Sequence, residues 1–215
     1  MWGRLIKRAT IAAGLLLASC IPASKPPPRT AGPTPPGDRA LRQCLADLGQ
    51  ENVAFRLLPG RSSAGGCTTT GTIQLLDIGT PVTNLGPMTC PLARSFERWT
   101  REAVQPAARA WFGSPVVRIE SFGTYSCRGV NGQIGGRLSE HGRSNAVDVA
   151  AFVLADGRRV TVLDGWNGDN RDARSFLRVV HQAGCRRFSV GLGPDANALH
   201  RNHFHFDMGA GPYCR

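Results

Sequence analysis

The chain has 215 residues, of which 41% are hydrophobic; this is enough for one core of ordinary size, although the length allows one or two domains. The net charge is +11 and is carried almost wholly by arginine, which favours polyanionic partners such as nucleic acid, anionic lipid or an acidic cell-wall polymer. No aromatic RNA-binding motif and no recognition-helix pattern accompanies the charge, so we do not expect a nucleic-acid-binding protein.

Residues 1–20 have the pattern of an export signal. Basic residues precede an apolar run of about a dozen residues, which is short for a membrane-spanning helix. The run ends in Leu17-Ala18-Ser19-Cys20, which resembles the bacterial lipobox, whose cysteine becomes the lipidated first residue of the mature protein. Cys20 is therefore the predicted lipid anchor. The alternative is simple cleavage near Ala18, which would leave a free mature protein.

A spacer and one domain follow this leader. Residues 21–39 are rich in proline and lack apolar periodicity, so we expect an extended, semi-rigid spacer that holds the domain away from a membrane. Residues 40–215 form the predicted domain. The expected location is the cell envelope, on a periplasm-facing membrane surface.

The cysteines of the domain indicate disulfides. Apart from Cys20 they are Cys44, Cys67, Cys90, Cys127, Cys185 and Cys214. An exported chain reaches an oxidising compartment, so we expect three disulfides, although the sequence leaves many pairings open. The pairing that we expect joins Cys44 to Cys67, Cys90 to Cys127, and Cys185 to Cys214. No two cysteines have CxxC spacing, which argues against a cysteine-bound structural zinc ion.

The first half of the domain is predicted to hold short elements and one long helix. Apolar spacing and β-branched residues predict a helix over 39–48, a strand over 53–58, a loop over 59–66 and a strand over 70–78. The clearest helical pattern covers 91–112, where apolar residues recur every three or four positions. Pro106 should kink this helix or split it in two. A strand is expected over 116–122.

The second half begins with a predicted hairpin. Two apolar runs, 146–154 and 158–163, are separated by an Asp-Gly turn, which is a strong hairpin signal. A helix is expected over 169–183, closed by Gly184, and a strand over 188–192. Short strands with intervening helices and no sustained βαβ alternation predict an α+β fold, in which helices flank a small antiparallel sheet and disulfides brace it.

The last predicted strand carries three of the five histidines. Residues 200–207 have the sequence HRNHFHFD. Side chains alternate along a strand, so His203, His205 and Asp207 should lie on one face while Phe204 and Phe206 enter the core on the other. Imidazoles that face a cleft are common zinc ligands.

An upstream segment supplies the complementary groups. Residues 139–148, SEHGRSNAVD, contribute His141 and Asp148. A carboxylate in so apolar a run needs a partner, either one of the many arginines or a metal ion. Each histidine also has a simple explanation, as a loop hydrogen bond or a packed ring. Two histidines and one carboxylate are nevertheless a ligand set of catalytic zinc sites that keep a fourth position open. We therefore expect His141, Asp148 and His205 to bind Zn²⁺.

Both segments resemble the zinc D-alanyl-D-alanine peptidases and the penicillin-insensitive murein endopeptidases. These families share the pattern SxHxxGxAxD followed by a terminal HxH. Ser139, His141, Ala146 and Asp148 match the pattern, and Ser144 stands in place of its glycine. The spacing of the three late histidines is similar to the HxxHxH of the murein endopeptidases.

A closer resemblance is to the bacterial extensin-like C-terminal domain, which belongs to the same metallopeptidase superfamily. It rests on Tyr125-Ser126-Cys127-Arg128, the SEH segment, the late cysteine and NHFHFD, and covers about residues 44–214. The resemblance is specific at the two histidine segments and looser before Tyr125.

The resemblance implies roles for individual residues. It makes His141, Asp148 and His205 the zinc ligands and Arg128 the group that binds the substrate carbonyl or carboxylate. Some relatives have a catalytic glutamate where this chain has Asn202, so His203 is the candidate general base and acid, or oxyanion stabiliser. Ser139 and His200 are further substrate-binding candidates.

The implied function is a zinc-dependent peptidase that hydrolyses D-alanine-containing bonds in peptidoglycan stem peptides or cross-links. The departures at Ser144 and Asn202 leave an alternative, a non-hydrolytic lipoprotein that keeps the fold and binds anionic wall polymer. A third interpretation is a structural, disulfide-rich envelope protein whose histidines bind no metal.

Overall fold

The computed structural model describes residues 36–63, 65–133 and 135–215. The predicted leader, the lipidation candidate Cys20 and most of the spacer lie outside these residues, so the structure does not test them. Among the described helices, none combines the length and the apolarity needed to cross a membrane.

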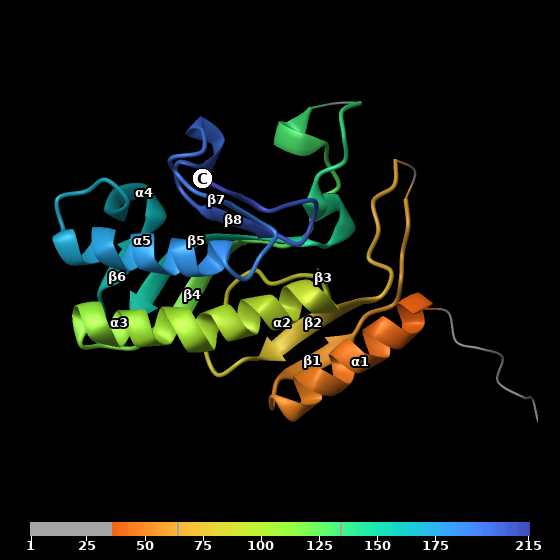
Figure 1. The fold of residues 1–215 in the computed structure, drawn as a ribbon, viewed down its shortest axis with the longest axis horizontal. Helices are drawn as coiled ribbons and strands as arrows, with labels where there is room; N and C mark the ends of the chain where they lie inside the picture. The colour runs from red at the N-terminus through yellow and green to blue at the C-terminus, as the bar shows by residue number, and fades with distance from the viewer. Residues whose placement is uncertain (1–35, 64, 134) are drawn as a thin grey trace, which may run out of the picture. The chain divides into compact units, whose positions relative to one another are not determined.

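The N-terminal part of the domain is a helix beside a three-stranded sheet (Figure 1). The helix α1 covers Pro36–Gln50 and the strands are β1 (Ala54–Leu57), β2 (Thr72–Asp77) and β3 (Met88–Thr89), all antiparallel. The helix begins three residues before the range expected from apolar spacing. Pro36 lies in the first turn, where backbone N–H groups have no partner within the helix, so a residue without an N–H costs no hydrogen bond there.

The long helical stretch divides into three parts. These are α2 (Cys90–Trp99), a π-helical segment (Thr100–Val104) and α3 (Gln105–Phe112). The predicted split therefore occurs, but the π-helical turn precedes Pro106, which occupies the first turn of α3. Gly113 ends the helix in a left-handed conformation, with φ of 65°.

A six-stranded sheet makes up the rest of the domain. Its strands are β4 (Val116–Gly123), β5 (Ala146–Leu154), β6 (Arg159–Thr161), β7 (Val190–Leu192), β8 (Phe204–Asp207) and β9 (Tyr213–Cys214). The order is β4-β5-β8-β7-β9, and β6 pairs with β5 in the predicted hairpin. All neighbours are antiparallel except β7 and β9, which are parallel. The long strand β5 is therefore central, with β4 on one edge and β6 and β8 sharing the other.

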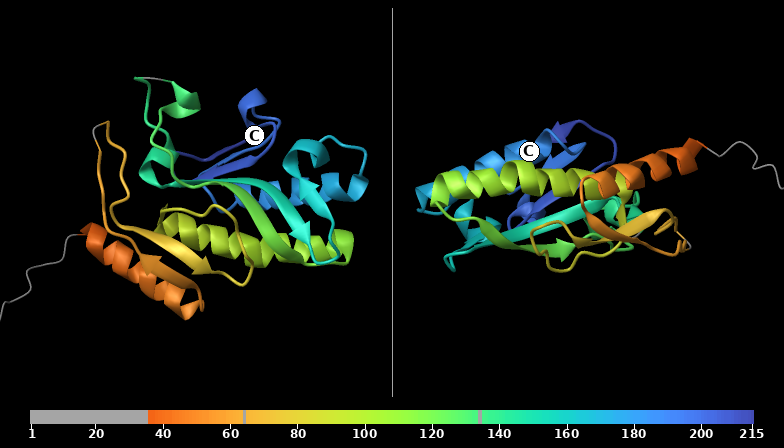
Figure 2. Two further views of the ribbon diagram at one scale, coloured as in Figure 1. Left: turned by 180° about the vertical axis from the view of Figure 1, so that it is seen from behind. Right: turned by 90° about the horizontal axis from the view of Figure 1, so that it is seen from below.

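Helices α2, α3 and α5 (Arg171–Cys185) lie along one face of this sheet, and the short α4 covers Val162–Gly165 (Figures 1 and 2). The aromatic side of β8 faces them. Trp99 of α2 contacts Phe206 at 5.3 Å and Phe152 at 6.1 Å between ring centroids, and Phe152 meets Phe176 of α5 at 5.1 Å. This core holds β5 and β8 in place from behind, so their other faces can carry polar groups.

The predicted end of the last helix is wrong. We expected Gly184 to close it, but α5 continues through Gly184 and ends at Cys185. Gly184 instead allows a close approach, because a Cβ placed there would lie 2.3 Å from Cζ of Phe206. The absence of a side chain thus serves helix-to-strand packing and does not terminate the helix.

The α+β class and the disulfide bracing are confirmed, but two predicted cysteine pairs are wrong. The bonds are Cys44–Cys90, Cys67–Cys127 and Cys185–Cys214, of which only the last was expected. The first joins α1 to the start of α2, and the second joins the β1–β2 loop to the segment after β4. These elements come together through tertiary packing, so neighbouring positions in sequence are a poor guide to pairing.

Candidate metal centre

The six-stranded sheet brings together side chains from distant segments. The β5–β8 register pairs Asp148 directly with His205, and cross-strand partners lie about 4.5–5.5 Å apart at Cβ. His141 comes from the 3₁₀ turn Glu140–Arg143 that leads into β5. The three residues are buried or half-buried, and their potential ligand atoms lie within 4.8 Å of one another.

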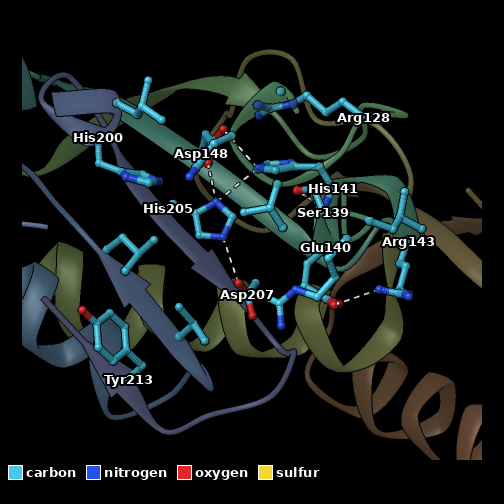
Figure 3. A pocket seen from close by; sticks show the side chains of 18 of the residues that line it. Arg128, Ser139, Glu140, His141, Arg143, Asp148, His200, His205, Asp207 and Tyr213 are labelled. Atoms are coloured by element: carbon cyan, nitrogen blue, oxygen red, sulfur yellow. Dashed lines mark hydrogen bonds and ion pairs between the residues drawn. The ribbon is translucent and has the colours of Figure 1, made fainter. Parts of the chain in front are cut away.

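The ligand atoms converge on one point (Figure 3). Nε2 of His141 lies 3.2 Å from a carboxylate oxygen of Asp148, and Nδ1 of His205 lies 2.9 Å from the other oxygen. The two ring nitrogens are 3.1 Å apart. The predicted ligand trio therefore meets in space, and no arginine pairs with Asp148 among the described residues.

The outer ring nitrogens show which inner atoms hold lone pairs. Nδ1 of His141 lies 3.3 Å from the carbonyl oxygen of Thr124, and Nε2 of His205 lies 2.9 Å from a carboxylate oxygen of Asp207. Both outer partners are acceptors, so each outer nitrogen carries the proton in the neutral ring. The inner nitrogens then present lone pairs to each other and to a carboxylate. Such an arrangement needs positive charge at its centre, either a proton on an inner nitrogen or a metal ion, and the nitrogen and oxygen donors fit a zinc ion.

The same electrostatics appear in the protonation equilibria. Burial raises the pKa of Asp148, but hydrogen bonds from His141 and His205 outweigh it and hold that pKa below its usual range. Burial lowers the pKa of His205, yet the carboxylates of Asp148 and Asp207 raise it to about 9. The cluster therefore favours positive charge in its centre.

His203 lies beside the trio but is oriented differently. Its Nδ1 is 2.9 Å from Oδ1 of Asn202, and its Nε2 is 3.6 Å from Asp148. Because the Asn202 oxygen is an acceptor, Nδ1 carries the proton and Nε2 is free to accept one. The ring packs edge-on to Phe122 at 5.6 Å, and burial lowers the pKa of His203, so it is neutral near pH 7.

The two weaker substrate-binding candidates also line the cavity. Ser139 is buried, and its Oγ accepts a hydrogen bond from the backbone N–H of His141 at 3.3 Å, so it caps the turn that positions His141. His200 is buried, with Nδ1 2.9 Å from Asn197, and burial lowers its pKa to about 4. Both residues therefore have structural partners within the fold.

Arg128 lies at the rim of a cavity of about 560 Å³ that contains the cluster (Figure 3). It follows Cys127 directly, so the Cys67–Cys127 disulfide anchors the segment that carries it. The backbone of Arg128 also accepts a hydrogen bond from Ser139 at 3.1 Å. The structure thus brings every predicted ligand, catalytic and substrate-binding residue to one cavity.

Sequence reasoning assigned no role to several groups that shape the site. Asp207 was expected on the face of His205, and the strand alternation in HFHFD was the available signal for its contact. The carbonyl of Thr124 and the ring of Phe122 had no signal, because both lie at the junction where β4 ends. A second possible grouping, His181 with Cys185 and Cys214, has its two sulfurs joined in a disulfide.

Fold and site together define a disulfide-braced α+β domain with a His–Asp–His cluster in the wall of a cavity. A family model described as Extensin-like protein C-terminus matches residues 42–215. The chain therefore belongs to the extensin-like protein C-terminus family, as the sequence resemblance indicated. No curated protein and no solved structure matches this chain significantly.

Proposed function

We propose that this protein is a zinc-dependent peptidase that hydrolyses D-alanine-containing peptide bonds in peptidoglycan, and that its family is related to the zinc D-Ala-D-Ala peptidases. The observation that carries the proposal is the convergence of His141, Asp148 and His205. Two lone pairs and one carboxylate meet in a buried centre that opens into a cavity large enough for a peptide.

The proposed ligands would hold zinc through Nε2 of His141, Nδ1 of His205 and the carboxylate of Asp148. A bound zinc ion supplies Lewis-acid chemistry, in that it polarises a carbonyl group and activates water. Hydrolysis adds water across the amide: the hydroxyl bonds to the carbonyl carbon, the C–N bond breaks, and the nitrogen leaves with a proton.

The chain's own residues would manage that proton and the developing charge. His203 is neutral with Nε2 free beside Asp148, so it can accept a proton from water and return it to the leaving nitrogen. Arg128 would bind the carbonyl or carboxylate of the substrate with its guanidinium group. Asn202 would fix the ring orientation of His203.

The two departures from the peptidase pattern are compatible with this function. Ser144 stands at a glycine position and has φ of 56°, in the left-handed region that favours glycine. Its hydroxyl donates to the carbonyl of Thr68 at 3.1 Å, which stabilises the same backbone course. Asn202 replaces a glutamate but orients His203, which is a candidate for the same proton transfer.

Partners and location are proposed from the sequence alone. We propose an envelope protein that faces the periplasm, anchored to a membrane through lipid on Cys20, and that contacts peptidoglycan or another anionic wall polymer. The alternative is a non-hydrolytic wall-binding protein, which the lack of a glutamate at position 202 favours.

Zinc content and product mass on defined muropeptides test the proposal. The wild type should bind about one zinc ion per chain and release D-alanine or separate cross-linked peptides, and a chelator should abolish this until zinc is restored. His205→Ala should lose both zinc and hydrolysis. His203→Ala should keep zinc but hydrolyse roughly 10²–10⁴-fold more slowly. Zinc-loaded wild type that releases nothing would refute the peptidase and leave the wall-binding alternative.

A further inference from the structure

The cavity does not end at the proposed zinc ligands. A second hollow, of about 340 Å³, shares Arg128, His141, Asp148 and His203 with the first. A third, of about 540 Å³, shares Phe122 and Asn202 with the second. The shared walls make one groove with the His–Asp–His cluster partway along it. Each end is as large as a typical small-molecule site.

The end beyond His203, which we call the far arm, has no unpaired cation among the described residues that line it. Phe122 and Leu163 project into it and are 58% and 54% exposed. Arg159 is paired with Glu120 at 2.6 Å, and Asp164 keeps its negative charge while it accepts a hydrogen bond from the hydroxyl of Thr161 at 2.7 Å. These two side chains offer apolar contact area to a segment that lies in this hollow.

The other end, the near arm, holds cations that are unpaired among the described residues, whereas its carboxylates are engaged: Asp148 and Asp207 contact His205, and Glu140 is paired with an arginine. Arg128 and Arg137 line it, and neither forms an ion pair within the described part of the chain. Arg143 is also there but is paired with Glu140 at 3.2 Å (Figure 3). Two unpaired guanidinium groups favour a ligand segment that carries free carboxylates.

We propose that the groove binds peptide on both sides of the metal centre, so that the substrate bond is internal and joins two peptide segments. This rests on the proposed function and specifies its substrate as a cross-linked wall peptide. The carboxylate-bearing segment lies in the near arm, and the segment without free carboxylates lies against Phe122 and Leu163. Removal of a single terminal residue would leave most of one arm unused, whereas an internal bond uses both.

Binding to a parent protein with strongly slowed hydrolysis separates this proposal from cleavage. The parent is zinc-loaded His203→Ala, and the probes are a purified cross-linked muropeptide dimer and its uncross-linked monomer, measured by calorimetry. The groove variant adds Phe122→Ala with Leu163→Ala. The matched control adds Leu57→Ala with Leu76→Ala, which are 55% and 59% exposed on β1 and β2, away from the groove. Melting curves verify that all three proteins fold.

We expect the parent to bind the dimer more tightly than the monomer. The ratio of the two affinities should fall about tenfold in the groove variant and stay unchanged in the control. Equal affinities for dimer and monomer, or an equal loss in the control, would overturn the proposal. A wild type that only trims terminal D-alanine from monomers, with no dimer preference, would leave the peptidase standing and the groove proposal wrong. Dimer-selective binding without any hydrolysis by the wild type would support the groove proposal and refute the peptidase.

Discussion

At the scale of single residues, the outer contacts of the histidines decide what the centre can bind. Asp207 shares the face of His205 and accepts from its Nε2, and its other oxygen accepts from the backbone N–H of Gly209 at 2.7 Å. A metal-binding imidazole whose second nitrogen donates to a carboxylate is held in one tautomer and one orientation. Asp207 is therefore a positioning residue for the proposed zinc ligand.

Asp207→Asn should weaken zinc binding about 10–100-fold, because the neutral amide has a single oxygen, which cannot accept from both Nε2 of His205 and the N–H of Gly209. Competition with a chromophoric chelator measures the affinity. The control is Asp195→Asn, whose carboxylate also accepts from a ring N–H, that of Trp166 at 2.8 Å, but lies outside the centre. Unchanged zinc affinity in Asp207→Asn would show that the contact does not position the ligand.

His181 shows the opposite behaviour, that of a histidine kept neutral by its surroundings. Its ring packs against Trp166 and Phe204, with centroids 5.4 and 5.0 Å away. Burial lowers its pKa to about 4; the nearby Asp195 raises that pKa somewhat, and Arg178 lowers it. His181 is therefore a core residue that lies outside the candidate metal centre.

The stability of the protein should therefore fall with acidification through His181. Its folded pKa lies below the unfolded value of about 6.5, so between the two the unfolded chain binds a proton that the folded chain does not. The contribution of neutral, buried His181 to the free energy of unfolding is fully present above the unfolded pKa and is lost as the pH falls toward 4. Urea unfolding measures the free energy of unfolding at pH 7 and at pH 4.5. Its decrease between the two pH values should be about 2 kcal/mol larger for the wild type than for His181→Gln. Equal losses would contradict this.

At the scale of elements, the site depends on how α5 presses on β8. Trp99 and Phe188 hold Phe206 from other sides, at 5.3 and 4.8 Å between ring centroids, and Gly184 lets the helix backbone approach the ring. Phe206 lies between His205 and Asp207 in the strand. The position of the proposed ligand is thus set by packing on the opposite face.

Gly184→Ala should lower the free energy of unfolding by about 1–3 kcal/mol, because the new methyl group overlaps the Phe206 ring. Denaturant unfolding measures this. Gly49→Ala in α1 is the matched control, since a Cβ placed there would have no other atom within 4 Å, and it should leave stability unchanged or raise it by up to about 1 kcal/mol. A destabilisation of the same size in both variants would argue against the packing explanation.

At the scale of the whole domain, two disulfides of similar span have different neighbours. Cys44–Cys90 and Cys67–Cys127 close loops of 46 and 60 residues. The second lies next to the site, because Cys127 precedes Arg128 and the N–H of Thr68 donates to the carbonyl of Gly142 at 2.8 Å. It links the segment of Arg128 to the turn that carries His141.

Replacing either pair by serine should cost about 4 kcal/mol of unfolding free energy in the chain-entropy account. The effects on muropeptides should differ: loss of Cys67–Cys127 should raise KM, because the Arg128 segment is released, whereas loss of Cys44–Cys90 should leave KM unchanged. Denaturant unfolding and steady-state kinetics measure the two quantities. An equal rise in KM for both double variants would show that the disulfide acts only through global stability.

The sequence by itself determined the local features of this protein. Periodicity predicted the long helix, the β5–β6 hairpin and the polar and aromatic faces of β8, because these depend on residues close together in the chain. The convergence of His141, Asp148 and His205, the proposed zinc ligands, was expected because strand alternation places His205 on the polar face and the family resemblance links the two distant segments. Tertiary structure alone decided the pairing of Cys44 and Cys67, the contact of Asp207 and Thr124 with the two histidines, and the groove along Phe122 and Leu163. These depend on register and packing between segments far apart in sequence, where no local pattern specifies which surfaces meet.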